Sequence, residues 1–379
     1  MFETGIPKTM RAVVIEGDKA VVKDGVPVPL LDDGFMLIKV CAVAVNPMDW
    51  KHVEFKMGSE GAILGCDVAG QVLSIGSSVS ATDFRVGDYV CSFIHGGSTK
   101  RHMNGAFAEY AAVDASLTYC LPQGIKAAPN SEDSLPEGPV DTVEGAASLP
   151  VGLTTSGGVL VHELRLALDW EPEKPQKDTP LLVWGGATSV GQVLIQVAKK
   201  LHGFTKIIAV ASKKHEKQLR EYGADEVYDY HDKDVVQQIQ ERHNDIQVLV
   251  DVVSSEQTIQ QVYRCASRDK PATVVQLEFL NIEQIHPEDR RDDVKIIGTL
   301  IYLSAGWDVP IGPYHFPPNP QYRKEMISFV KFIDEKVKSG EIHHIPVKIN
   351  RNGLEDIPAL MEQIKQGKNS GEKFVTVLE

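Results

Sequence analysis

The chain has 379 residues, more than the ~100–200 typical of one domain, so we expect two domains. Its formal net charge of −13 at pH 7 disfavours binding to nucleic acid or anionic lipid, and no stretch is apolar for the ~18 residues that a membrane span needs. The five cysteines form no CxxC pair and the N-terminus does not resemble a signal or transit peptide, so we expect a cytoplasmic protein without disulfides.

The first 120 or so residues alternate short apolar runs with glycine-containing turns. This spacing is typical of a compact β-rich domain. The predicted strands cover residues 10–17, 34–46, 68–76, 86–94 and 105–113. Residues 123–140 are rich in Pro, Gly, Ser and acidic side chains without periodicity, and we expect a surface loop there.

From about residue 154 the pattern changes to strands that alternate with helices. Such alternation predicts βαβ units around a parallel, doubly wound sheet, with buried strands at 181–186, 206–212, 246–255 and 272–279. After about residue 320 the alternation ends, and the sequence predicts a helix, a strand, a second helix and a terminal strand. We expect these last elements to return and complete the first domain, in a fold of class α/β.

A glycine-containing turn follows the first strand of the second domain. Gly185 and Gly186 end the strand, and Gly191 opens a helix whose apolar residues share one face. A strand, a turn of this kind, a helix and a second strand within about 30 residues form the context of a dinucleotide fingerprint. Glycine allows the backbone to approach a pyrophosphate, whose charge the helix N-terminus attracts. The alternative is a plain turn between a strand and a helix that binds nothing. We predict a dinucleotide site instead.

The end of the second strand indicates which dinucleotide binds. An NAD site places an acid about 20 residues after the glycines to bind the ribose 2′-hydroxyl. Here the sequence is Ser212-Lys213-Lys214-His215 instead. We therefore predict NADPH, with Lys213 and His215 as charges and Ser212 as a donor for the 2′-phosphate. The alternative is a solvated helix start, in which two lysines are unremarkable.

Motifs along the whole chain carry a family resemblance. They are VAVNPMDWK at 43–51, LGCDVAGQVLSIG at 64–76, FRVGDYV at 84–90, GAFAEY at 105–110, AASLPVGLTT at 146–155, the WGGATSVG turn, YGADEVYDY at 222–230 and SGEK at 370–373. With these motifs the chain resembles a medium-chain dehydrogenase/reductase of the zinc-independent branch. That branch includes quinone oxidoreductases, fungal trans-acting enoyl reductases and the yeast NADPH-dependent aldehyde reductases. Among these, the chain resembles the yeast aldehyde reductases most.

The resemblance implies a GroES-like catalytic domain at residues 1–153 and 320–379 and a Rossmann NADPH-binding domain at residues 154–319. It also implies the cofactor contacts. At the nicotinamide end these are Asn46, Pro47, Met48 and Asp49; Leu277 and Leu300 to Tyr302 face the nicotinamide or the substrate. The pyrophosphate lies at Thr188, Ser189, Val190 and Gly191, near Gly186. The adenosine end meets Ser212, Lys213, His215 and Tyr230, and Gly371 and Lys373 close over the cofactor.

The segment that holds zinc in metal-using relatives is altered. Catalytic zinc needs three protein ligands, and those relatives have a Cys where this chain has Asn46 and a Gly-His-Glu where it has Gly65-Cys66-Asp67. A site made of Cys66, Asp67 and either His52 or His95 matches none of the usual ligand sets, so we predict no metal. Cys66 is then expected to be a small buried residue, with a reactive thiol as the alternative.

Without a metal, the protein has to orient the nicotinamide and stabilise charge on the substrate oxygen. Lys51, His52 and Tyr302 are candidate donors, but a plain surface loop explains Lys51 and His52 somewhat better, and a packing aromatic explains Tyr302 somewhat better. We predict an NADPH-dependent reductase of activated C=O or C=C bonds (aldehydes, quinones and α,β-unsaturated carbonyls), which acts on a small molecule as a monomer or homodimer. The alternatives are a trans-acting enoyl reductase with a carrier-bound substrate and a non-catalytic NADPH-binding protein.

Overall fold

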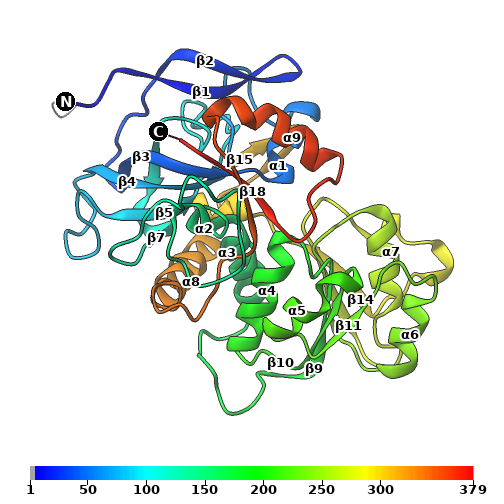
Figure 1. Cartoon of the computed structure of the whole chain (residues 1–379). Helices are drawn as coiled ribbons and strands as arrows, with labels where there is room; N and C mark the ends of the chain where they lie inside the picture. Colours follow the sequence, from blue (N-terminus) through cyan, green and yellow to red (C-terminus); the bar gives the residue numbers. More distant parts are fainter. Residues whose placement is uncertain (1–4, 379) are drawn as a thin grey trace. The chain divides into compact units, whose positions relative to one another are not determined.

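The computed structural model describes residues 5–378, which form two compact units (Figure 1). The first unit comprises the described residues up to Thr154 and those from Tyr302 onward, and the second comprises Thr155–Ile301. In the part of the chain that the structure describes, no helix is long and apolar enough to cross a membrane.

An eight-stranded sheet forms the centre of the first unit. Its order is β7-β5-β4-β3-β18-β17-β8, and β6 also pairs with β3. The strands are β3 (Phe35–Ala44), β4 (Asp67–Ile75), β5 (Tyr89–Phe93), β6 (Tyr110–Asp114), β7 (Thr118–Cys120), β8 (Ser134–Leu135), β17 (Val347–Asn350) and β18 (Lys373–Val377). The C-terminal strand β18 is antiparallel to β3, with Val375 opposite Ala44, so the two ends of the chain build one sheet.

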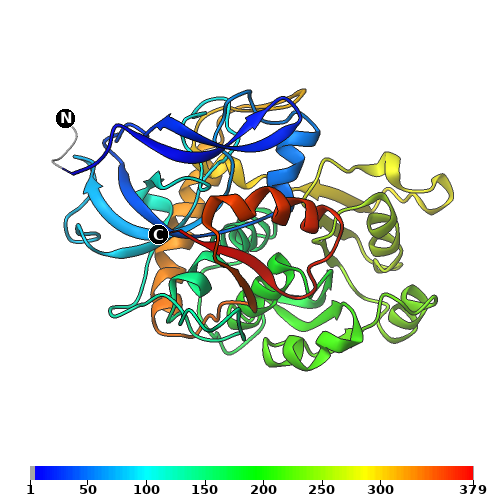
Figure 2. The same ribbon diagram turned by 45° about the horizontal axis from the view of Figure 1, so that its top comes forward.

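Two antiparallel ribbons and five α-helices accompany the sheet in the described part of this unit. The ribbons are β1 (Thr9–Glu16) with β2 (Lys19–Pro27) and β15 (Val309–Ile311) with β16 (Tyr314–Phe316). The helices are α1 (Pro47–Glu54), α2 (Val143–Ala147), α3 (Pro150–Gly157, which runs across the division between the units), α8 (Pro320–Lys338) and α9 (Ile357–Lys365). Helix α9 lies against α1 and β2 (Figure 2). Its residues Ile357, Leu360 and Met361 join the buried core of the sheet.

A six-stranded parallel sheet of order β11-β10-β9-β12-β13-β14 forms the second unit. The strands are β9 (Lys177–Trp184), β10 (Phe204–Val210), β11 (Glu226–Tyr228), β12 (Val248–Asp251), β13 (Ala272–Gln276) and β14 (Val294–Gly298). The helices are α4 (Ser189–Lys200), α5 (Glu216–Glu221), α6 (Val235–Arg242) and α7 (Glu256–Arg264). Consecutive strands run outward in both directions from β9, which is the doubly wound order.

Both faces of this sheet are buried, which explains its continuous apolar strands. Leu182 and Trp184 of β9 pack in one core with Val235 of α6 and Ile259 of α7. Leu181 and Val183 alternate with them, so they point to the opposite face, and they are fully buried as well. The predicted fold class, a GroES-like β-rich domain with a doubly wound parallel domain, is confirmed.

The segment 302–319 lies in the first unit, whereas the predicted second domain extended to residue 319. The stacking of the Tyr302 ring on His95 and the ion pair of Lys100 with Asp308 (2.9 Å) attach it there. Its elements are a single-turn helix and two three-residue strands. Elements this short carry no periodicity from which a domain could be assigned.

Candidate active site

The turn between β9 and α4 has the geometry of a phosphate-binding turn. Gly185 has φ +88°, a conformation that favours glycine. A Cβ on Gly191 would lie 2.4 Å from the Gly185 carbonyl oxygen and 2.8 Å from the Gly186 Cα, so the turn closes tightly only with glycine there. The Thr188 hydroxyl caps α4 by accepting from the Gly191 N–H (3.0 Å). The first N–H groups of α4 therefore face the same end of the sheet as the turn.

The predicted pyrophosphate residues gather at this turn. Thr188, Ser189 and Val190 are all half-buried beside the buried Gly186. The helical face that was predicted to be apolar is buried behind them, with Val193, Leu194, Val197 and Leu201 nearly inaccessible. The turn thus lies on a buried core, while its residues Thr188 to Val190 stay partly exposed.

The end of β10 carries the residues predicted for the adenosine phosphate. Ser212 and His215 are half-buried and Lys213 is exposed. The Lys213 N–H donates to Asp229 (2.9 Å), and its ammonium pairs with Glu216 (2.8 Å). Burial first, and then the neighbouring charge of Lys214, lower the pKa of His215. Tyr230 follows Asp229 in the chain, half of its surface is exposed, and its ring centroid is 4.1 Å from that of His231.

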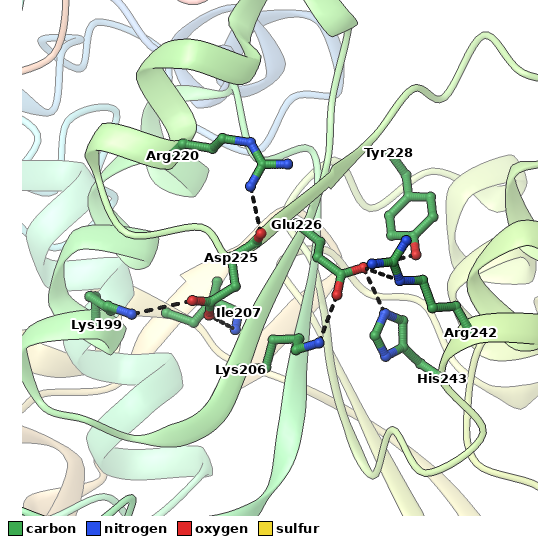
Figure 3. Close-up of polar contacts among 9 residues, drawn as sticks. All are labelled: Lys199, Lys206, Ile207, Arg220, Asp225, Glu226, Tyr228, Arg242 and His243. Atoms are coloured by element: carbon green, nitrogen blue, oxygen red, sulfur yellow. Dashed lines mark hydrogen bonds and ion pairs between the residues drawn. The ribbon is translucent and has the colours of Figure 1, made fainter.

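Lys213 lines a pocket of about 390 Å³ that the sequence did not predict. The same pocket is lined by Glu216, Arg220 and the edge strand β11. Figure 3 shows that Glu226, the acidic residue of that strand, is already paired with side chains of the protein. Glu226 accepts from Lys206 (2.7 Å), His243 (2.9 Å), Arg242 (3.1 Å) and Tyr228 (3.1 Å). Burial opposes ionisation, but the donors, led by Lys206 and His243, lower the pKa of Glu226 to about 2.

Arg220 is also committed to protein partners. Its guanidinium pairs with Glu216 (2.9 Å) and donates to the Asp225 carbonyl (2.6 Å, Figure 3). Lys213 lines the same pocket and shares its acidic partner Glu216 with Arg220. Its contact with a ligand stays a prediction. Two further predicted residues, Leu277 and Leu300, are half-buried after β13 and β14. The Leu277 N–H donates to the Ser254 hydroxyl (2.8 Å).

In the first unit, the loop before α1 carries the residues predicted for the nicotinamide end. Asn46 and Asp49 are buried, Met48 is half-buried and Pro47 is exposed. Asp49 accepts from the Asn46 N–H (2.7 Å), which stabilises the first turn of α1. Burial, reinforced by the charge of Asp67, raises the pKa of Asp49 to about 7.

A closed polar ring lies behind this loop. The Lys373 ammonium pairs with Asp67 (2.8 Å) and donates to the side-chain oxygen of Asn46. The Asn46 amide in turn donates to Asp67 (2.8 Å). Gly371 is half-buried two residues before Lys373, with φ +72°. The contacts of Gly371 and Lys373 with a cofactor remain predictions.

Two of the three candidate donors lie in one buried cluster with an aromatic wall. Tyr302 is stacked on His95 (ring centroids 3.7 Å apart) and on Phe93 (5.7 Å), and the His52 ring is 5.7 Å from it. The Cys66 sulfur is 3.6 Å from the Tyr302 hydroxyl. Lys51 lies apart, half-buried, with its ammonium 5.7 Å from the centre of the Trp50 ring.

Burial keeps the two imidazoles and the thiol of this cluster uncharged near pH 7. Burial lowers the pKa of His52 to about 4, against a smaller opposing effect of the Met48 carbonyl. Burial also lowers the pKa of His95 and raises that of the Cys66 thiol well above its usual range. Among residues 5–378, neither ring nitrogen of His52 has a hydrogen-bond partner. The cluster can therefore donate or accept hydrogen bonds, but it carries no full charge.

The similarity of the chain to known proteins agrees with this geometry. Residues 32–123 match the model of the alcohol dehydrogenase GroES-like domain, and residues 189–307 match that of the zinc-binding dehydrogenases. The uncharacterized protein YNL134C of Saccharomyces cerevisiae is 56% identical over 378 residues, with 100% of each chain covered. The trans-enoyl reductase ACTTS2 of Alternaria alternata is 32% identical over 97% of this chain and 98% of its own length.

The chain belongs to the medium-chain dehydrogenase/reductase family. The predicted resemblance is confirmed, and the protein is an oxidoreductase of this family. Its fold is also that of the quinone oxidoreductase from Coxiella burnetii, which is 21% identical with a TM-score of 0.65 over 98% of this chain and all of the other.

The zinc named by one matched family model does not fit the residues of this medium-chain dehydrogenase/reductase. Both carboxylate oxygens of Asp67 are taken, one by the Val151 N–H (2.7 Å) and the other by Asn46 and Lys373. A metal ion there would meet the lysine ammonium. Between Gly5 and Leu378, no three or more His, Cys, Asp or Glu side chains converge to hold a metal ion. Cys66 is buried, as predicted.

Sequence reasoning missed the roles of Asp67 in the polar ring and of His95 in the aromatic cluster. Asp67 was considered only as a metal ligand, and its pairing with Lys373, 306 positions later, has no local signal. His95 was likewise considered only as a ligand, whereas its ring supports Tyr302. A buried lysine in a predicted strand is the one signal that could have been used, because a buried ammonium needs an acid.

Proposed function

We propose that this protein is an NADPH-dependent reductase of activated C=O or C=C bonds that works without a metal. The observation that carries the proposal is the turn between β9 and α4, where Gly191 leaves no room for a side chain. Thr188 to Gly191 would hold the pyrophosphate, and Ser212, Lys213 and His215 the adenosine phosphate. When bound, NADPH supplies the hydride.

The neutral cluster of the first unit restricts the substrate. Reduction of an enone, an enoyl thioester, a quinone or an aldehyde places negative charge on oxygen. The hydroxyl of Tyr302, the thiol of Cys66 and the imidazole of His52 can donate hydrogen bonds to such an oxygen, but a metal or an imidazolium is not offered. Donors of this strength suffice where the charge spreads over a conjugated system. Simple ketones lack that relief, so we propose that they are poor substrates.

The experiment that tests this function is a turnover panel with the purified chain. We expect steady oxidation of NADPH with at least one of quinones, enones, enoyl thioesters and aldehydes, and little with unactivated ketones. Tight binding of NADPH without turnover of any compound in the panel would reject the reductase in favour of a non-catalytic NADPH-binding protein.

A second candidate is supported by the similarity to the trans-enoyl reductase ACTTS2, which extends over 97% of this chain. In that case the enoyl group would be presented on a carrier protein. Turnover of the same enoyl group as a free thioester and as a carrier-bound thioester separates the two. A much higher kcat/KM for the carrier-bound form favours the trans-acting reductase, and rapid turnover of free aldehydes favours the first candidate.

Replacement of Lys213 by an acid should weaken the preference for NADPH. Lys213 lines the pocket at the end of β10, and its side chain is 64% exposed, which leaves it accessible to a phosphate. Loss of one charged contact to a phosphate costs roughly 1.5–3 kcal/mol, so we expect Lys213→Glu to raise the KM for NADPH about 10- to 100-fold while the KM for NADH changes little.

Lys217→Glu is the matched control, because it makes the same change of charge one helical turn away on a side chain that is 90% exposed. The control should keep its NADPH to NADH ratio within about threefold, as expected for a screened surface charge. An unchanged ratio in Lys213→Glu would remove Lys213 from the phosphate site.

A further inference from the structure

Lys373 is the first residue of β18, and its side chain is only 2% exposed. Lysine is almost never buried to this extent without an ionic partner, because an isolated ammonium loses its hydration. Here the partner is Asp67, which is fully buried, with the ammonium and the carboxylate 2.8 Å apart. The pair is therefore an internal pair of charges with no access to solvent ions.

The ring around this ammonium joins segments that are far apart in the sequence. Asn46 belongs to the loop before α1, Asp67 to the start of β4 and Lys373 to the start of β18. Val151 of α3 adds its N–H to the other oxygen of Asp67 (2.7 Å). Asn46 serves both charges, because its amide nitrogen donates to Asp67 and its oxygen accepts from Lys373. The four segments thus meet around one positive charge and its carboxylate partner.

We infer that the Lys373 ammonium is the resident cation of this site and takes, within the protein itself, the place that a bound metal ion would fill. The oxygens of Asn46 and Asp67 converge on a single positive centre, as ligands do on a cation. That centre is a covalently attached amine, so the site needs no metal to fold. A divalent ion at the same oxygens would be repelled by the ammonium in surroundings of low dielectric constant.

A buried ion pair leaves a particular signature when its members are removed. Removal of one partner leaves an uncompensated buried charge, whereas removal of both leaves none. We expect Lys373→Met to lower the Tm of the whole chain by roughly 5–15 °C, or to prevent folding, because the buried carboxyl of Asp67 loses its ionic partner. Asp67→Asn should also lower the Tm, because the buried amine of Lys373 then lacks its carboxylate partner. The double variant D67N/K373M should recover at least half of the loss seen in Lys373→Met.

Lys348→Met is the matched control, since it removes an exposed lysine from the neighbouring strand β17. It should change the Tm by about 2 °C or less. If the double variant is as unstable as the sum of the two single variants, the two charges do not compensate each other and the inference is wrong. If Lys373→Met does not fold, the double variant and Asp67→Asn still test the inference. The inference requires the double variant to fold, and a double variant that does not fold contradicts it.

Metal analysis of the wild-type protein gives an independent test. After purification without chelator we expect less than 0.1 equivalent of zinc, and no change of Tm after incubation with zinc or with a chelator. Stoichiometric zinc whose removal lowers the Tm would overturn the inference, since the ammonium and a metal ion cannot share these oxygens. Neither measurement depends on turnover, so this inference and the proposed reductase activity can fail separately.

Discussion

Gly191→Ala should abolish tight binding of NADPH. The added Cβ would lie 2.4 Å from the Gly185 carbonyl oxygen and 2.8 Å from atoms of Gly186, all of them backbone, so no side-chain rotation relieves the clash. The turn has to open, which moves the N–H groups that would meet the pyrophosphate. We expect the affinity for NADPH, measured by calorimetry or fluorescence titration, to fall at least about 100-fold. Overpacking should also lower the free energy of unfolding by about 1–3 kcal/mol, which is seen as a lower Tm.

The control for this prediction is Gly34→Ala, where a Cβ meets no atom within 4 Å. It makes the same change of side chain in an exposed turn of the first unit and should leave both the affinity and the Tm nearly unchanged. If Gly191→Ala lowers the Tm but binds NADPH as tightly as the wild type, the turn has a structural role only and the proposed cofactor site is wrong.

Asp49→Asn should stabilise the protein at alkaline pH but not at acidic pH. Burial raises the pKa of Asp49 to about 7 in the folded state, compared with its ordinary value of 3.8. Between these values the folded state binds more protons than the unfolded chain, so the free energy of unfolding falls as the pH rises through this window. The difference of about three pH units corresponds to roughly 4 kcal/mol, all of it lost above about pH 8.

Asparagine keeps an oxygen that can accept from the Asn46 N–H, but it has no charge to desolvate. The Tm of Asp49→Asn should therefore match that of the wild type near pH 4 and exceed it by roughly 5–15 °C at pH 8.5. His52 contributes in the opposite direction, because burial lowers its pKa to about 4 and the folded state binds fewer protons than the unfolded chain up to about pH 6.5. That contribution is common to both proteins and cancels in their difference.

Asp18→Asn, in the exposed turn between β1 and β2, provides the comparison. Its difference from the wild type should be the same at both pH values. A constant difference between Asp49→Asn and the wild type from pH 4 to pH 8.5 would mean that Asp49 keeps an ordinary pKa in the folded state.

Local pattern was sufficient for much of the fold. The buried strands β9, β10, β12 and β13 were predicted because continuous apolar runs between helices are characteristic of a parallel sheet covered on both faces. Strand β2 was missed because Lys19, Lys23 and Asp24 interrupt it on an exposed ribbon. Strand β14 (VKIIG) was missed because its short, half-exposed run at the sheet edge has no flanking helix pattern.

The site was predicted in its local parts and missed in its long-range parts. The glycine turn and the end of β10 are continuous in sequence, so spacing alone located them. The ring of Asn46, Asp67 and Lys373 and the stacking of Tyr302 on His95 depend on which strands become neighbours. A single sequence carries no signal for that pairing, and burial, which sets the pKa of Asp49 and His52, follows from the same tertiary contacts.

The position of β18 between β3 and β17 has a consequence for biosynthesis. The second unit is one continuous segment, Thr155–Ile301, and it can acquire its structure while later residues are still on the ribosome. The first unit cannot, because residues 42–44 of β3 pair with β18, which is translated only after the second unit. Until then this part of the β3 edge, next to the part that pairs with β6, is open for pairing with other chains, so we expect a product that stops before β18 to be prone to aggregation.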